Sequence, residues 1–92
     1  NKSVLESFSN SATKIYLTID LDGFSSAYAP GVSAPSPMGF APDIAVKVID
    51  WLNKSDKLIS ADIVELNPKF DLDNATARLA ARLIERLVTP SL

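Results

Sequence analysis

The run Ile15–Leu21 constrains the fold more than any other part of the chain. Its residues are mostly apolar β-formers, and it ends at two carboxylates, Asp20 and Asp22. A short run of this kind predicts a strand, and apolar residues on both faces are typical of a parallel strand that helices cover on both sides. Because residues i and i+2 of a strand share a face, the two carboxylates are expected to leave the strand together.

A long segment without helical or strand periodicity follows. Residues 23–42 hold all 3 glycines of the chain and four of its 6 prolines, so they predict an ordered or functional loop. Within this loop, residues 29–35 combine prolines with Gly31, which is free to take a positive φ. They could form a rigid pocket rim beside the carboxylates, or simply a proline-stiffened connection.

The second half of the chain predicts a helix, a strand and a helix. Apolar residues at three- and four-residue spacing predict a helix from Asp43 to about Asn53, with Pro42 in its first turn. A second strand is expected over Lys57–Leu66. Asp73 or Asn74 can cap a final helix. Its buried stripe is expected to be Ala75, Leu79, Ala80, Leu83 and Leu87, and its outer side Arg78, Arg82, Glu85 and Arg86.

The predicted order is therefore strand, helix, strand, helix, after a segment Val4–Phe8 that reads as the end of a helix and a polar break at residues 9–11. A strand-helix-strand crossover implies parallel pairing. Two parallel strands with their helices cannot cover both faces and both edges of the sheet. The chain is thus expected to be a portion of a larger α/β unit.

Composition narrows the kinds of partner. The formal charge is -2 over 92 residues, and the 9 basic residues form no run, which argues against a nucleic-acid partner. The chain has no cysteine and no histidine, so a metal could be bound only through oxygen ligands or through residues outside the chain. No long apolar run predicts a membrane segment, and a cytoplasmic setting is the default expectation.

The Asp20 and Asp22 pair is the first candidate site. Ligands gather at the carboxyl ends of parallel strands, where these residues lie. Oxygen ligands favour hard divalent ions such as Mg²⁺ or Mn²⁺, so the pair predicts a metal site. The alternative is local: Asp22 would start a turn and Asp20 would cap a backbone group.

Glu65 is the second candidate, at the carboxyl end of the second expected strand. A carboxylate matches the parallel N–H donors of an amidine or guanidine, so Glu65 could bind a cationic substrate. The alternatives are an ion pair with Lys69 or Arg78, or exposure to solvent. Asp62 lies on the opposite strand face from Glu65 and is expected to be structural.

Two motifs together resemble the ureohydrolase family of arginase, agmatinase and formimidoylglutamase. The first motif is Thr18-Ile19-Asp20-Leu21-Asp22, followed by Pro30-Gly31 and Gly39. The second is Asp62-Ile63-Val64-Glu65-Leu66-Asn67-Pro68. Residues 29–35, 65–71 and 76–82 look most like formimidoylglutamase. Residues 24–26 are Phe-Ser-Ser where arginase-type members have Leu-Asp-Pro, a difference that argues against arginine as the substrate.

The resemblance implies a three-layer α/β/α fold with a mainly parallel sheet, of which residues 1–92 would be the C-terminal portion of one catalytic domain. It implies a binuclear Mn²⁺ centre with Asp20 and Asp22 among the ligands, and Asp20 as the bridging one. It also implies that Glu65 binds the amidine or guanidine end of the substrate. No residue of this chain is expected to be a catalytic acid or base, because the family's histidine-bearing segments do not occur in it.

The implied reaction of the parent enzyme is hydrolysis of N-formimidoyl-glutamate to glutamate and formamide, with the isolated chain inactive without the preceding part of the domain. A homo-oligomer is compatible with this interpretation. Three alternatives stay open: a guanidine hydrolase of the agmatinase or arginase type, a haloacid-dehalogenase-type phosphatase with Asp20 as nucleophile, and a fragment whose carboxylates are inert.

Overall fold

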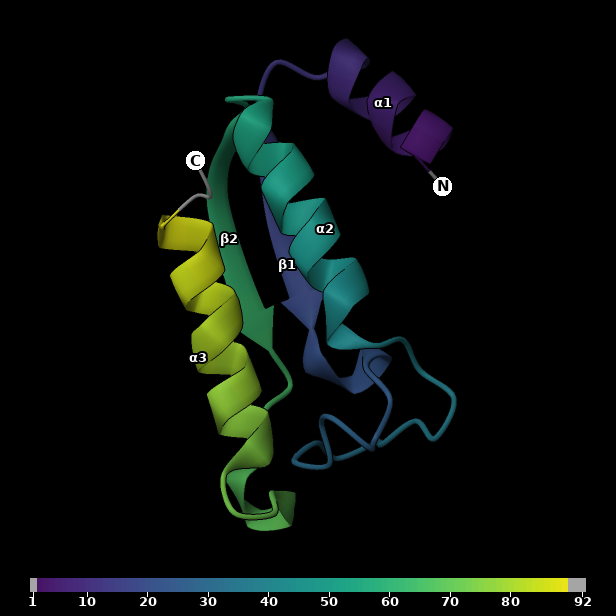
Figure 1. Cartoon of the computed structure of the whole chain (residues 1–92), viewed down its shortest axis with the longest axis vertical. Helices are drawn as coiled ribbons and strands as arrows, with labels where there is room; N and C mark the ends of the chain where they lie inside the picture. Colours follow the sequence, from purple (N-terminus) through teal and green to yellow (C-terminus); the bar gives the residue numbers. More distant parts are fainter. Residues whose placement is uncertain (1, 90–92) are drawn as a thin grey trace.

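The computed structural model describes residues 2–89, and its helices and strands follow the predicted order (Figure 1). The regular elements are helix α1 (Lys2–Ser11), strand β1 (Ile15–Asp20), helix α2 (Pro42–Lys54), strand β2 (Leu58–Val64) and helix α3 (Ala75–Val88). Two short 3₁₀ turns, η1 (Leu21–Gly23) and η2 (Pro68–Phe70), follow the strands. The strand-helix-strand-helix prediction is confirmed, and Pro42 begins α2 as expected.

The two strands pair in parallel, with Leu17 opposite Ala61 and Asp20 opposite Val64. Helices α2 and α3 contact each other and pack on one face of this sheet (Figure 1). One apolar cluster joins the sheet to both helices. It contains Ile19 from β1, Ile49 from α2 and Leu83 from α3. Burial of these side chains holds the strand ends, and with them the candidate site residues, in place.

The opposite face of the sheet is open within residues 2–89. Burial along β1 alternates, so that Ile15 and Ile19 are buried while Tyr16 and Thr18 are exposed. The outward face of β1 thus carries Tyr16 and Thr18, and the expectation that helices cover both faces of this strand stays a prediction, because residues 2–89 cover only one. A groove of about 320 Å³ lies beside the free edge of β1 and is lined mainly by apolar side chains of β1 and α2.

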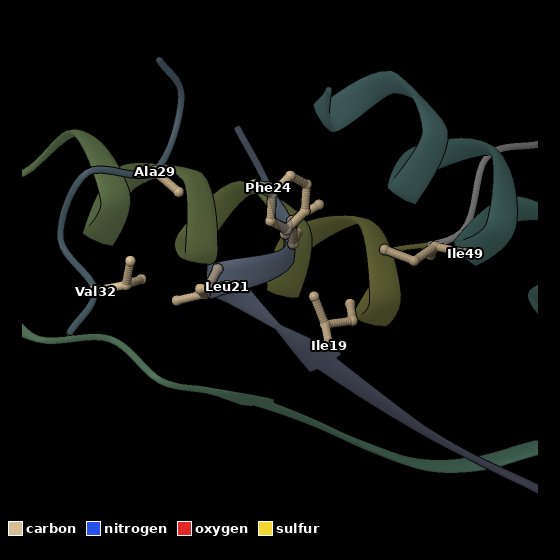
Figure 2. Close-up of a cluster of buried hydrophobic side chains, with 7 residues drawn as sticks. Ile19, Leu21, Phe24, Ala29, Val32 and Ile49 are labelled. Carbon is tan, nitrogen blue, oxygen red and sulfur yellow. The ribbon is translucent and has the colours of Figure 1, made fainter. Parts of the chain in front are cut away.

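The long loop supplies a large share of the core. Leu21 in η1 and three residues from the loop, Phe24, Ala29 and Val32, are almost completely buried (Figure 2). The two ends of the loop pair through backbone bonds, in which Phe40 N donates to Gly23 O at 3.1 Å and Ser25 N donates to Phe40 O at 2.9 Å. The loop is therefore ordered, as its proline and glycine content predicted.

Several element boundaries differ from the prediction. The polar break expected at residues 9–11 is wrong, because α1 continues to Ser11 and Ser11 Oγ bonds back to Phe8 O at 2.8 Å. Strand β1 ends at Asp20 rather than Leu21, which begins η1. Strand β2 ends at Val64 because the backbone of Glu65 takes φ 74°, which leaves the extended region.

Helix α3 also differs in detail. Neither Asp73 nor Asn74 caps it: Asn74 lies at the cap position in a left-handed conformation without a side-chain bond. In the expected buried stripe, Leu83 is buried and Leu79, Ala80 and Leu87 pack against the core, but Ala75 is exposed. The buried residue in the first turn is Thr76, with 0% exposure.

Candidate metal and substrate site

Asp20 and Asp22 are brought together by a turn rather than by strand alternation. Asp20 is the last residue of β1, and Asp22 lies inside η1. The Asp20 carboxylate accepts a hydrogen bond from Asp22 N at 3.1 Å and thereby caps the turn. The capping role that the sequence offered as the alternative to metal binding is thus present.

The charges at this end of the sheet are anionic and close together. The pKa of the Asp22 carboxyl is raised, first because it shares a hydrogen bond with the Asp20 carboxyl, and then by partial burial and by the negative charges of Asp20 and Glu65. Glu65 directly follows Val64, which is paired with Asp20 in the sheet, so the three carboxylates belong to the same end of the two strands. A cation that binds beside neighbouring carboxylates is attracted by their combined negative charge.

Glu65 sits immediately after β2, with an exposed side chain. Its φ of 74° is unusual for a residue with a side chain and costs on the order of 1–3 kcal/mol. Within residues 2–89 it forms no ion pair with Lys69 or Arg78, the partners considered from the sequence. Such backbone strain gathers at ligand sites because the surroundings enforce it there.

Asp62 lies on the sheet face away from the helices and has a different environment. Tyr16 donates a hydrogen bond from its phenol to Asp62 Oδ2 across the strands. This bond is the main reason that the pKa of Tyr16 is raised. Asp62 Oδ1 is buried and has no hydrogen-bond partner within the part of the chain that the structure describes. The contact with Tyr16 agrees with the structural role expected for Asp62.

The residues that hold the loop against α3 were missed from the sequence. Asp71 accepts hydrogen bonds from Thr76 N at 2.9 Å and Ala77 N at 3.1 Å, so it caps α3 from four residues upstream of Ala75. Burial alone would raise the pKa of Asp71, but these backbone donors and the Thr76 hydroxyl outweigh it and lower the pKa. The nearer residues Asp73 and Asn74 concealed this cap in the sequence.

Gly31 is the loop residue that meets this cap. Gly31 N donates to the buried Thr76 Oγ1 at 2.7 Å. A Cβ on Gly31 would lie 2.7 Å from the Asp71 Cβ, so only glycine allows the approach. The positive φ expected to be useful at Gly31 is absent, since no glycine among the described residues has one. Glycine is required here for space and not for backbone conformation.

Asp20 and Asp22 have the right chemistry to bind a hard divalent ion, but two carboxylates are fewer ligands than such an ion needs. Asp20 and Asp22 offer oxygen donors of the kind that Mn²⁺ accepts. Within residues 2–89 no group of three or more acidic, histidine or cysteine side chains could hold a metal ion. The donors among the described residues could therefore supply only part of a metal site.

The comparisons with known proteins identify the family. The family model described as "Arginase family" matches residues 1–89. The chain belongs to the arginase family. Membership accounts for both motifs and argues against the phosphatase alternative, in which Glu65 had no role.

Among arginase-family relatives, two formimidoylglutamases are similar to this chain. The protein from Rhodococcus jostii (strain RHA1) is 55% identical over 75 residues, covering 82% of this chain and 23% of the relative. The protein from Clostridium tetani (strain Massachusetts / E88) is 46% identical over 80 residues, covering 87% and 24%. The chain thus spans about a quarter of the length of the relatives it matches.

Solved structures of the arginase family share the fold. Arginase from Bacillus caldovelox superposes with a TM-score of 0.85 at 29% identity, over 99% of this chain and 32% of that structure. Formimidoylglutamase from Bacillus subtilis superposes with a TM-score of 0.87 at 24% identity, over 95% and 27%. These likenesses confirm the predicted arginase-like α/β fold class.

None of the helices within residues 2–89 is both long and apolar enough to cross a membrane. The cytoplasmic setting and the absence of a nucleic-acid partner stay predictions from the sequence.

Proposed function

We propose that this chain is the C-terminal portion of the catalytic domain of a manganese-dependent formimidoylglutamase. The parent enzyme would hydrolyse N-formimidoyl-glutamate to glutamate and formamide. In this proposal Asp20 and Asp22 are metal ligands, Asp20 is the bridging one, and Glu65 binds the amidine end of the substrate. The remaining ligands and the catalytic acid-base groups would come from the preceding part of the domain.

The observation that carries this proposal is the convergence of three carboxylates at one end of the sheet. Asp20 is paired with Val64, the residue before Glu65, and Asp22 N donates a hydrogen bond to the Asp20 carboxylate at 3.1 Å. Three anions from two strand ends, with one of them on a strained backbone, form a surface that attracts cations. Divalent metal ions and a protonated amidine are both cations that such a surface would attract.

The role of each residue follows from its position. The turn η1 fixes Asp22 beside Asp20, so their carboxylates together would hold one side of a metal centre. Bound divalent ions supply an activated water for hydrolysis at neutral pH. Glu65 accepts two parallel N–H donors, which sets the plane of the amidine and places its carbon toward the two aspartates.

The identity of the substrate rests on the relatives. The relatives of 55% and 46% identity are named formimidoylglutamase, whereas the two solved structures, an arginase at 29% and a formimidoylglutamase at 24%, do not separate the substrates. Residues 24–26, where arginase-type members carry Leu-Asp-Pro, here contain the completely buried Phe24. A guanidine hydrolase of the agmatinase or arginase type remains the alternative.

The test is an Asp20→Asn variant of the full-length enzyme that contains this chain. We expect manganese content, measured by elemental analysis, to fall below half of the wild-type value, and formamide release to fall by at least about a hundredfold, as for loss of a ligand. Asp56→Asn is the matched control, because Asp56 is exposed in a turn and has φ 58°, which Asn accepts readily.

Unchanged manganese content and turnover in Asp20→Asn would contradict the metal assignment. Assaying the wild-type enzyme with N-formimidoyl-glutamate, agmatine and arginine separates the substrate alternatives. A phosphoaspartate trapped on Asp20 would instead favour the phosphatase interpretation. A wild-type enzyme without activity on any amidine or guanidine would support the non-catalytic alternative.

A further inference from the structure

Glu65 lies between two anchored points of the chain. On one side, Val64 is paired with Asp20 in the parallel sheet. On the other, Asn67 N donates to Gly31 O at 2.6 Å, and Asn67 Nδ2 donates to Ser33 Oγ at 2.9 Å. Two residues, Glu65 and Leu66, must therefore connect fixed ends. A strained φ persists only when the surroundings determine it, and these two anchors are such surroundings.

The loop anchor is itself held by Thr76. Gly31 accepts from Asn67 through its carbonyl and donates through its N–H to Thr76 Oγ1 at 2.7 Å. Thr76 is completely buried, and its hydroxyl also bonds to Asp71. We refer to Asn67, Gly31, Thr76 and Asp71 as the loop clamp. It joins the end of β2, the long loop and the first turn of α3 at one end of the molecule (Figure 1).

The clamp is well determined by packing. Figure 2 shows Ala29 and Val32, which flank Gly31, beside helix α3. Both are almost completely buried, so the loop cannot shift without exposing apolar surface. The close approach of Gly31 to Asp71 leaves no room for a side chain. The hydroxyl of Thr76 is thus the acceptor that satisfies the buried Gly31 N–H.

From these contacts we infer that Thr76 is a positioning residue for Glu65, acting through Gly31 and Asn67. The inference rests on the proposed function, in which Glu65 binds the amidine. Loss of the Thr76 hydroxyl leaves the buried Gly31 N–H without an acceptor and loosens the anchor at Asn67. Glu65 then relaxes from φ 74°, and its carboxylate is no longer held in the position that the proposed function requires.

The experiment compares Thr76→Val and Thr76→Ser in the full-length enzyme. Valine keeps the shape of threonine and lacks the hydroxyl, whereas serine keeps the hydroxyl. We expect Thr76→Val to raise the KM for N-formimidoyl-glutamate about tenfold, the usual consequence of losing a buried hydrogen bond. Manganese content should stay at the wild-type value, because Asp20 and Asp22 are held by β1 and η1. Thr76→Ser should stay within about twofold of wild type.

A purely structural role for Thr76 would give different results. In a Glu65→Gln background, Thr76→Val should raise KM little further, because the two changes act on one interaction. Additive effects of the two substitutions, or an unchanged KM in folded Thr76→Val, would overturn the inference. Thr13→Val is the matched control, since Thr13 is exposed at the surface between α1 and β1.

Two further measurements keep the test decisive. If Thr76→Val does not fold, Ser33→Ala removes an exposed part of the same anchor, and an unchanged KM in that variant overturns the inference. Amide hydrogen exchange needs no substrate. It should speed up about tenfold over residues 65–71 in Thr76→Val and not in Thr76→Ser. Unchanged exchange over residues 65–71 in Thr76→Val would reject the loop clamp, whether or not the wild-type enzyme hydrolyses an amidine. Absence of amidine hydrolysis by the wild-type enzyme would reject only the proposed function.

Discussion

Arg86 of α3 binds Asp50 of α2 through two parallel hydrogen bonds, from Nε to Oδ1 at 2.7 Å and from Nη2 to Oδ2 at 2.6 Å. From its sequence pattern Arg86 was expected on the outer side of α3, and it is instead half-buried between the two helices. This pair links helices α2 and α3, which together cover one face of the sheet. The forked geometry matches the two oxygens of a carboxylate, which lysine cannot reproduce.

The Asp50–Arg86 pair makes stability depend on pH at the acid end. The hydrogen bond from Arg86 is the main reason that the pKa of Asp50 is lowered. A carboxyl whose pKa is lower in the folded state than in the unfolded state stabilises the protein at any pH above its unfolded-state pKa. This stabilisation is lost as the pH falls through its folded-state pKa. We expect Asp50→Asn to lower the urea midpoint at pH 7 and to change it little at the most acidic pH at which the protein stays folded. An equal loss at both pH values would contradict this account.

Leu83 is expected to be the most sensitive position of α3. It is 1% exposed and lies in the cluster with Ile19 and Ile49. Leu83→Ala should reduce the free energy of unfolding by about 2–5 kcal/mol, as for other buried leucines. Urea denaturation followed by circular dichroism measures the change. Arg82→Ala, one residue earlier with an exposed side chain, is the control and should change it by less than about 1 kcal/mol.

The glycines of the loop should differ in their tolerance of a methyl group. A Cβ on Gly39 would lie 2.6 Å from the backbone carbon of Phe24, which cannot move without breaking the pairing of the loop ends. A Cβ on Gly23 would meet the ring of Phe40, which is 39% exposed and can turn away. Gly39→Ala should therefore cost about 1–3 kcal/mol and Gly23→Ala less. The midpoint of urea denaturation ranks them, and the reverse order would show that the loop ends are not rigidly paired.

Glu65→Gln tests the substrate role directly. The amide keeps the size of Glu65 but loses the charge and one acceptor. A hydrogen bond to a charged group contributes roughly 1.5–3 kcal/mol, so kcat/KM should fall about ten- to hundredfold. Manganese content should stay unchanged. Glu85→Gln, in an exposed side-chain pair with Arg82, is the control. A Glu65→Gln enzyme with normal kinetics would remove Glu65 from the substrate site.

The sequence by itself determined the order of elements, the parallel pairing and the two motifs of the family. These depend on periodicity and on short spacings, which the chain carries locally. The positions of Asp20, Asp22 and Glu65 near strand ends were also predictable, because a strand's end is a local property. Their metal-binding and substrate-binding roles stay predictions that the proposed experiments test.

Only the tertiary structure decided how these residues meet. Asp20 and Asp22 converge through a 3₁₀ turn and not through strand alternation. The loop residues Phe24, Ala29 and Val32 form core without any periodic pattern. The Gly31–Thr76 bond joins residues 45 positions apart, and neither residue's neighbours in sequence indicate it. Contacts between distant segments depend on the packing of the whole unit, and for that reason the local pattern of the sequence did not contain them.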